Sequence, residues 1–281
     1  MKIFDEISEV KLKDTKHRMV LKGWGEAVAD GIELNRIVYN SEGIPVKGYI
    51  AKPVNITGKL PLIIWNRGGD EKNGLLDDFL AFGILGEIAS WGYIVAASMY
   101  RDADEFGGAD VNDVINLMNL ASGIKDSDGI NIGMEGWSRG GMMTYLALTK
   151  TDKVKCAITV AGLANLKRNF LINNYLDKKF EELFPEKSGF DREKEIRKRS
   201  AVDIFRDINT STSLLMMHGT ADDKVSFEDS LELYEQLNSV SASAKYEIEI
   251  IEDGDHYLSR HKQFVSEKRR KWYGKYLKFK D

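Results

Sequence analysis

Cysteine is almost absent from this chain, because Cys156 is the only one among 281 residues. A single cysteine permits no intrachain disulfide and excludes a metal site built from several cysteines. The neighbours of Cys156 in "KCAITVAG" are mostly apolar. We therefore expect it to be a buried structural thiol rather than a reactive one.

Long apolar runs and a strong excess of charge are also missing. No uncharged apolar stretch reaches membrane-spanning length. The first 20 residues carry charges too often for the apolar core of a signal peptide. The formal net charge is −4, and the basic runs are interleaved with acids, so nothing attracts nucleic acid in general. These absences predict a cytoplasmic protein that binds neither nucleic acid nor membrane.

What the chain does contain is a regular alternation of apolar runs and helical segments from Leu60 onward. Strands are expected over 61–66, 93–99, 130–136, 155–162, 213–219 and 245–252, and helices near 75–91, 109–122, 139–150, 226–240 and 258–278. Strands that are apolar on both faces, with crossover helices between them, indicate a doubly wound, mostly parallel sheet. The length suits one α/β domain over 1–281.

Three segments stand outside this alternation. Residues 1–31 are expected to form an amphipathic helix and a loop, as an N-terminal extension. Residues 32–53 contain two strand-like runs around the turn residues Asn40 to Gly43, which predicts an antiparallel hairpin. Residues 163–209 are polar, helical and too long for a simple crossover. We expect them to form a small helical excursion over the carboxyl ends of the strands, where open α/β sheets bind ligands.

Glycines surround a single serine in "GWSRGG". A serine nucleophile must stand clear of the backbone, and a sharp strand-to-helix turn achieves this at a cost of about 1–3 kcal/mol of strain. Such a turn leaves no space for side chains at Gly136 and Gly140. We therefore predict that Ser138 is a nucleophile, bordered by Arg139 and by Trp137, a candidate for contact with substrate. The backbone N–H of Arg139, at the start of the following helix, is the predicted first oxyanion donor.

A serine nucleophile needs a base, and the chain has only four histidines: His17, His218, His256 and His261. His17 precedes the sheet, and His218 ends a strand, where it is expected to pack or hydrogen bond. His261 belongs to a charged helical segment. His256 alone lies in a loop directly after a strand, where Gly254 allows a sharp turn. We predict that His256 is the general base, with His261 as the next candidate.

An acid must orient the histidine, and two neighbours are candidates. Asp222 and Asp223 both follow the strand that ends near Met217, in "HGTADDKV". Either choice gives the order serine, aspartate, histidine along the chain, which is the order of α/β-hydrolases. The spacing alone does not decide which of the two aspartates is the catalytic acid.

The stretches "GWSRGG", "LLMMHGTADDKV" and "EDGDHYL" together resemble the catalytic domain of the prolyl oligopeptidase family of serine peptidases. The likeness covers about Ile32 to Phe264, with gaps in the excursion. It implies an α/β-hydrolase fold and hydrolysis by a serine, for which no metal and no cofactor is needed. In the family's pattern H-G-x-x-D-x-x-V the acid is the fourth residue after the histidine. That implies Asp222 as the acid, with Val225 matching the valine.

The sequence departs from the family after the first central strand. Family members carry there a tyrosine that completes the oxyanion hole, or a His-Gly-Gly stretch that does so with its backbone. This chain has "WNRGGD", with Arg67 at that place. The implied second donor is the backbone N–H of Gly69 or its neighbour Gly68. Arg67 has two interpretations, contact with a substrate carboxylate or a structural pair with an acid. Arg139 stands where a tyrosine is common.

The large peptidases of the family also carry a β-propeller, and only about 30 residues precede the hairpin here. The resemblance therefore supports the chemistry more than the substrate. The leading hypothesis is a serine-type peptidase acting on short peptides. A carboxylesterase or deacylase of small-molecule esters is the alternative. A non-catalytic binding module on the same scaffold is the third, and the complete triad argues against it.

Overall fold

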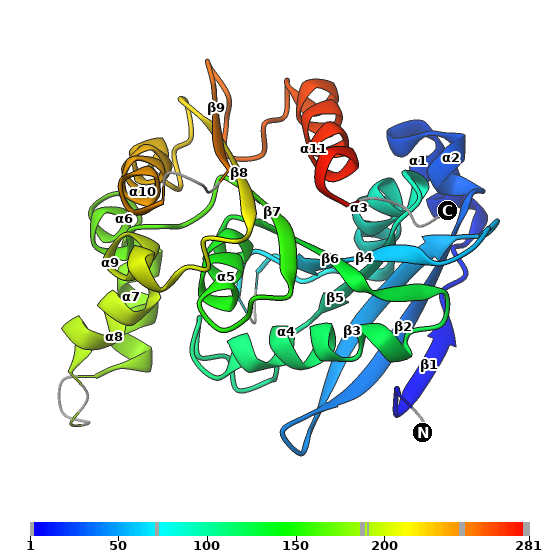
Figure 1. Cartoon of the computed structure of the whole chain (residues 1–281), viewed down its shortest axis with the longest axis horizontal. Helices are drawn as coiled ribbons and strands as arrows, with labels where there is room; N and C mark the ends of the chain where they lie inside the picture. Colours follow the sequence, from blue (N-terminus) through cyan, green and yellow to red (C-terminus); the bar gives the residue numbers. More distant parts are fainter. Residues whose placement is uncertain (1–2, 71–72, 186–188, 190, 242–244, 278–281) are drawn as a thin grey trace.

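The computed structural model describes residues 3–70, 73–185, 189, 191–241 and 245–277. In this part of the chain a single nine-stranded sheet has the order β1-β2-β3-β5-β4-β6-β7-β8-β9 (Figure 1). Strands β1, β2 and β3 pair antiparallel along one side of the sheet, and β3 pairs antiparallel with β5. The other six strands, β4 to β9, are parallel to one another. The strands are β1 (Glu6–Glu9), β2 (Ile32–Ser41), β3 (Ile44–Pro53), β4 (Leu60–Asn66), β5 (Ile94–Ser98), β6 (Ser127–Trp137), β7 (Val154–Val160), β8 (Ser213–Gly219) and β9 (Tyr246–Ile251).

Helices cover both faces of this sheet. The α-helices are α1 (Asp14–Trp24), α2 (Glu26–Ala29), α3 (Asp78–Ser90), α4 (Asp110–Asn119), α5 (Arg139–Leu148), α6 (Leu166–Ile172), α7 (Asn174–Leu183), α8 (Arg192–Arg199), α9 (Ala201–Ile204), α10 (Phe227–Val240) and α11 (Lys262–Tyr276). One hydrophobic core joins α4, α5 and α10 to the sheet, and a second joins α1, α2, α3 and α11 to it. The predicted doubly wound α/β-hydrolase sheet is confirmed.

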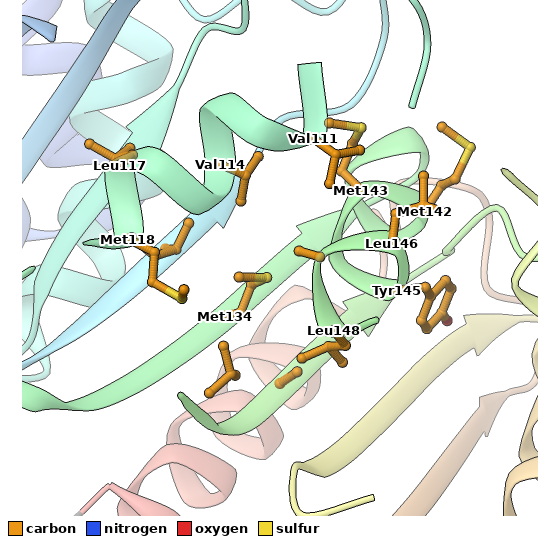
Figure 2. Close-up of a cluster of buried hydrophobic side chains, with 14 of the residues drawn as sticks. Val111, Val114, Leu117, Met118, Met134, Met142, Met143, Tyr145, Leu146 and Leu148 are labelled. Atoms are coloured by element: carbon orange, nitrogen blue, oxygen red, sulfur yellow. The ribbon is translucent and has the colours of Figure 1, made fainter. Parts of the chain in front are cut away.

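Burial in the core explains why the central strands could be predicted from apolar runs in the sequence. All residues of β4 and β5 are buried, as their continuous apolar runs predicted. Figure 2 shows how side chains of α4 and α5, among them Val114 and Met143, pack over Met134 of β6. Each such side chain contributes about 1.5–3 kcal/mol on burial. None of the helices in the described residues is both long enough and apolar enough to cross a membrane.

The amino-terminal part of the structure agrees with one prediction from the sequence and differs from another. The hairpin is confirmed, with β2 and β3 paired from Ile32 opposite Pro53 to Ser41 opposite Ile44. Its turn residues have positive φ, as a tight primed turn requires. The expectation of only helix and loop over 1–31 was wrong, because β1 pairs antiparallel with β2 at the edge. All four β1 residues are exposed, so no buried alternation signalled a strand.

The excursion between β7 and β8 consists of α6 to α9 and contacts the loops that follow β4 and β5. Phe180 of α7 packs edge-on against Phe106, with 5.5 Å between the ring centroids. The hydroxyl of Tyr175 donates a hydrogen bond to Asp70, in the loop after β4. Arg168 of α6 pairs with Asp229 of α10 at 2.7 Å. These contacts place the excursion beside the loops at the carboxyl ends of the strands.

Candidate active site

Ser138 occupies the sharp turn between β6 and α5, with φ 57° and ψ −123°. A positive φ is rare for a residue with a side chain and stores strain, a common property of functional sites. The flanking glycines allow the turn. A Cβ on Gly136 would lie 1.9 Å from the carbonyl oxygen of Gly140, and a Cβ on Gly140 would lie 2.0 Å from that of Asn66. No side chain fits at either position.

Replacing Gly140 with alanine should therefore lower the free energy of unfolding by about 1–3 kcal/mol, since the methyl group meets backbone that cannot move aside. Urea-induced unfolding measures this change. Gly23→Ala is the matched control, because a Cβ on Gly23 in α1 meets nothing within 4 Å. The control should gain up to about 1 kcal/mol from helix propensity. If both variants unfold like the wild type, the turn is looser than its geometry indicates.

His256 and Asp222 form a direct buried pair. Nδ1 of His256 lies 2.8 Å from Oδ2 and 3.0 Å from Oδ1 of Asp222. The His256 side chain is 8% exposed and that of Asp222 is 0% exposed. Asp223, the other candidate, is exposed. The geometry thus pairs His256 with Asp222, and Nε2 is the ring nitrogen that the carboxylate leaves free.

A second histidine supports the same acid. Nε2 of buried His218 lies 3.1 Å from Oδ2 of Asp222, and its Nδ1 lies 2.8 Å from the hydroxyl of Ser230. The backbone N–H of Val225 donates to Asp222 at 2.9 Å. Burial by itself would raise the pKa of Asp222, but the hydrogen bonds from His218 and His256 outweigh it and hold that pKa well below its usual range. Asp222 is therefore an ionised, fixed carboxylate.

The expectation that His218 packs or forms hydrogen bonds at a strand end agrees with these contacts, although its bond to the acid was not predicted. The available signal was its spacing, four residues before Asp222 across the turn after β8. The side chains of His218 and Asp222 meet in this buried turn, so His218 helps to orient the carboxylate of Asp222.

The three triad candidates come from one edge of the sheet. Ser138 follows β6, Asp222 follows β8 and His256 follows β9, and parallel pairing from β6 through β9 brings the carboxyl ends together. The turn is tied to β7 by the N–H of Ser138, which donates to the oxygen of Val160 at 2.9 Å. Within the described residues no hydrogen bond joins Ser138 to His256.

The loop after β4 lies against the serine turn because β4 and β6 are paired. A Cβ on Gly68 would lie 3.0 Å from the oxygen of Trp137 and 3.4 Å from Cβ of Ser138. Gly69 has φ +66°, and a Cβ there would lie 1.9 Å from the oxygen of Asn73. Gly69 therefore requires glycine, and Gly68 leaves little room for a side chain. They place backbone beside Ser138, as an oxyanion site needs.

Arg67 is enclosed in the wall of the site. Its side chain is 2% exposed. Nη1 donates to the oxygens of Gly68 and Asp70 at 3.1 and 3.0 Å, and Nε donates to that of Met99 at 3.2 Å. These bonds favour the structural interpretation of Arg67 over contact with a substrate carboxylate.

The side chain of Trp137 is likewise directed into the protein. Its indole N–H donates to Glu135 at 2.9 Å, and the guanidinium of Arg269 lies 5.6 Å from the ring centroid. Arg269 belongs to α11 and binds Glu135 at 2.7 Å. Trp137 is partly buried in this arrangement, which favours packing against α11 over the predicted contact with substrate. The side chain of Arg139 is also enclosed, with 2% exposed.

Sequence comparisons agree with the geometry. The model of the prolyl oligopeptidase family matches residues 89–280. An uncharacterized peptidase of Bacillus subtilis is 25% identical over 236 residues, which cover 78% of this chain and 34% of the relative. Dipeptidyl aminopeptidase B of Saccharomyces cerevisiae is 26% identical over 160 residues, which cover 56% of this chain and 18% of the relative. The chain thus spans about a third or less of the length of these relatives.

Solved structures share the fold. An acylaminoacyl peptidase of Pyrococcus horikoshii has a TM-score of 0.74 at 22% identity, covering 90% of this chain and 43% of its own. An acetyl xylan esterase of a Paenibacillus species has a TM-score of 0.67 at 16% identity, covering 95% of this chain and 89% of its own. Because the family model matches more than half of the sequence, and the fold and motifs agree with it, the chain belongs to the prolyl oligopeptidase family.

Proposed function

We propose that this chain is a serine hydrolase that cleaves a peptide, amide or ester bond through an acyl-enzyme. The observation that carries the proposal is the buried His256–Asp222 pair at the same sheet edge as Ser138, a serine held at φ 57°. An ionised acid, a histidine with one free ring nitrogen and a strained serine are the groups that nucleophilic acyl transfer requires.

The proposed reaction begins when His256 removes the proton from Ser138 and Oγ attacks the substrate carbonyl. Asp222 holds the imidazole in the required tautomer and stabilises its cation. The backbone N–H groups of Arg139 and Gly69, with Gly68 as the alternative, stabilise the tetrahedral oxyanion. His256 then protonates the leaving group. Water hydrolyses the acyl-enzyme by the same steps in reverse, and no metal or cofactor is needed.

A short peptide is the substrate class we favour. The family and the names of the Bacillus and yeast relatives support peptide or amide hydrolysis. We further propose that residues 1–281 form one domain in which the 163–209 excursion is a cap. The contacts of Phe180 with Phe106 and of Tyr175 with Asp70 support this role, since they place the excursion beside the loops of the site.

A small-molecule ester is the second candidate. The fold of the acetyl xylan esterase, whose name states its substrate, matches 95% of this chain. An esterase with this fold over almost the whole of this chain supports a carboxylesterase or deacylase.

A substrate panel separates these proposals. Purified protein is given p-nitrophenyl acetate, aminoacyl p-nitroanilides and short unmodified peptides, and kcat/KM is measured for each. A peptidase should turn over the anilides and peptides as well as the activated ester. An esterase should turn over the ester alone. Absence of turnover of every substrate would contradict both proposals and favour the binding module.

A further inference from the structure

The loop after β4 holds its backbone carbonyls against buried side chains. The acceptors are four successive oxygens, those of Arg67, Gly68, Gly69 and Asp70. The donors are the hydroxyl of Tyr100 and the Nη1 atoms of Arg67 and Arg139, at distances of 2.9 to 3.1 Å. Arg139 reaches the oxygen of Gly69 at 2.9 Å from the helix that follows the nucleophile.

These bonds determine which way the peptide N–H groups point. In a trans peptide the N–H points opposite to the carbonyl of the preceding residue. Because the carbonyls of Arg67 and Gly68 face the buried cluster, the N–H groups of Gly68 and Gly69 face away from it. Neither N–H has a hydrogen-bond partner among the residues that the structure describes. An oxyanion donor must be free of such a partner.

Buried carboxylates fix the two arginines. Nη1 and Nη2 of Arg139 each bind an oxygen of Asp104 at 2.6 Å, and Nη2 also binds Asp110 at 2.6 Å. Nη2 of Arg67 lies 3.9 Å from Asp104. All four side chains are at most 3% exposed. The formal charges of the two guanidinium groups and the two carboxylates cancel. If one guanidinium moved away, a buried carboxylate would lose its partner, which is energetically costly.

The aromatic ring of Tyr100 contacts both arginines, with the guanidinium carbons of Arg67 and Arg139 at 4.6 and 5.2 Å from its centroid. The cluster therefore joins three segments: the loop after β4, the segment after β5 and the start of α5. Arg139 contributes twice. Its backbone N–H is one proposed oxyanion donor, and its side chain holds the residue that supplies the other.

We infer that Arg139 and Arg67 are positioning residues of the oxyanion hole. Arg67 orients the N–H of Gly69 through the carbonyl of Gly68, and Arg139 holds the next peptide of the same loop through the carbonyl of Gly69. Asp104 and Asp110 fix the two guanidinium groups beside Ser138. The inference rests on the proposed function.

Arg139→Lys tests it, with Arg101→Lys as the matched control. Arg101 also forms a buried ion pair in the segment after β5, with Asp113 at 2.7 Å, but donates to none of the four carbonyls. Loss of a whole oxyanion donor lowers kcat about a hundred- to thousandfold. A displaced donor should lower kcat about ten- to hundredfold in Arg139→Lys while KM stays within about threefold. In the control, both constants should stay within about twofold.

A second readout does not depend on activity. The N–H of Asp70, in the peptide whose carbonyl Arg139 binds, donates to the oxygen of Asn73 at 2.8 Å. Hydrogen exchange of this N–H, followed in a peptide that spans residues 67–70, should be faster in Arg139→Lys than in the wild type and unchanged in Arg101→Lys. If Arg139→Lys fails to fold, Arg67→Lys replaces it, because Arg67 holds two of the same carbonyls.

The inference is wrong if hydrogen exchange and kcat of Arg139→Lys match those of the wild type. It is also wrong if Arg139→Lys and Arg101→Lys both lose kcat in proportion to their loss of thermal stability. A wild type that turns over none of the substrates contradicts the proposed function instead. Exchange at 67–70 then still decides whether the arginines hold the loop.

Discussion

Alanine at Ser138 or at His256 should each lower kcat about a millionfold, and the double variant should be no slower than either single one. The two side chains act in the same step, because Oγ of Ser138 attacks only when the imidazole of His256 takes its proton. The measurement is kcat with p-nitrophenyl acetate, or with an aminoacyl anilide if the panel selects one, on each purified variant. Unfolding curves verify that the variants remain folded.

His261→Ala is the matched control for this result. His261 is the other histidine near the carboxyl end of the chain, where it precedes α11. Its replacement should leave kcat within about twofold, since the histidines that bond to Asp222 in the described part of the chain are His256 and His218 and not His261. Full activity in His256→Ala, with a large loss in His261→Ala, would move the base to His261 and overturn the assignment.

The second large effect concerns the acid. Asp222→Asn should lower kcat about ten-thousandfold, because an amide facing Nδ1 favours the wrong imidazole tautomer. His218 would also face an amide in place of the carboxylate that it contacts at 3.1 Å. The shape of the side chain is kept, so the loss reports hydrogen bonding and charge rather than volume. The same kinetic assay measures it.

Asp223→Asn makes the same chemical change one residue away. Asp223 is exposed, while the side chain of Asp222 is fully buried against His256. The Asp223 variant should therefore keep its kcat within about twofold of the wild type. A larger loss in Asp223→Asn than in Asp222→Asn would show that the acid of the working enzyme is not the one paired in this structure.

Much of the fold was predictable because its signals are local. The apolar runs of β4 and β5 indicated buried strands, and both are buried throughout. The glycines around Ser138 indicated a turn without room for side chains, and the added Cβ atoms would meet backbone at about 2 Å. By contrast, β1 gave no signal, because its four residues are exposed and the residues of β2 that pair with them lie 26 to 32 positions further along the chain.

The environments of the arginines could not be predicted in the same way. Arg139 and Asp104 are 35 residues apart in sequence and Arg139 and Gly69 are 70 apart, so only the folded sheet shows that they meet. A buried arginine that holds backbone and an exposed arginine that binds substrate have the same letter and similar neighbours. The partner of His218 was not predicted for a related reason, because its bond to Asp222 depends on the turn after β8.

The most direct test of the central claim is labelling of the wild-type protein with a fluorophosphonate, followed by mass spectrometry of its peptides. The reagent reacts with a serine that is activated by a base. We expect one adduct, on Ser138, and none in Ser138→Ala or His256→Ala. An adduct on another serine, or no adduct under conditions that label a control serine hydrolase, would contradict the account.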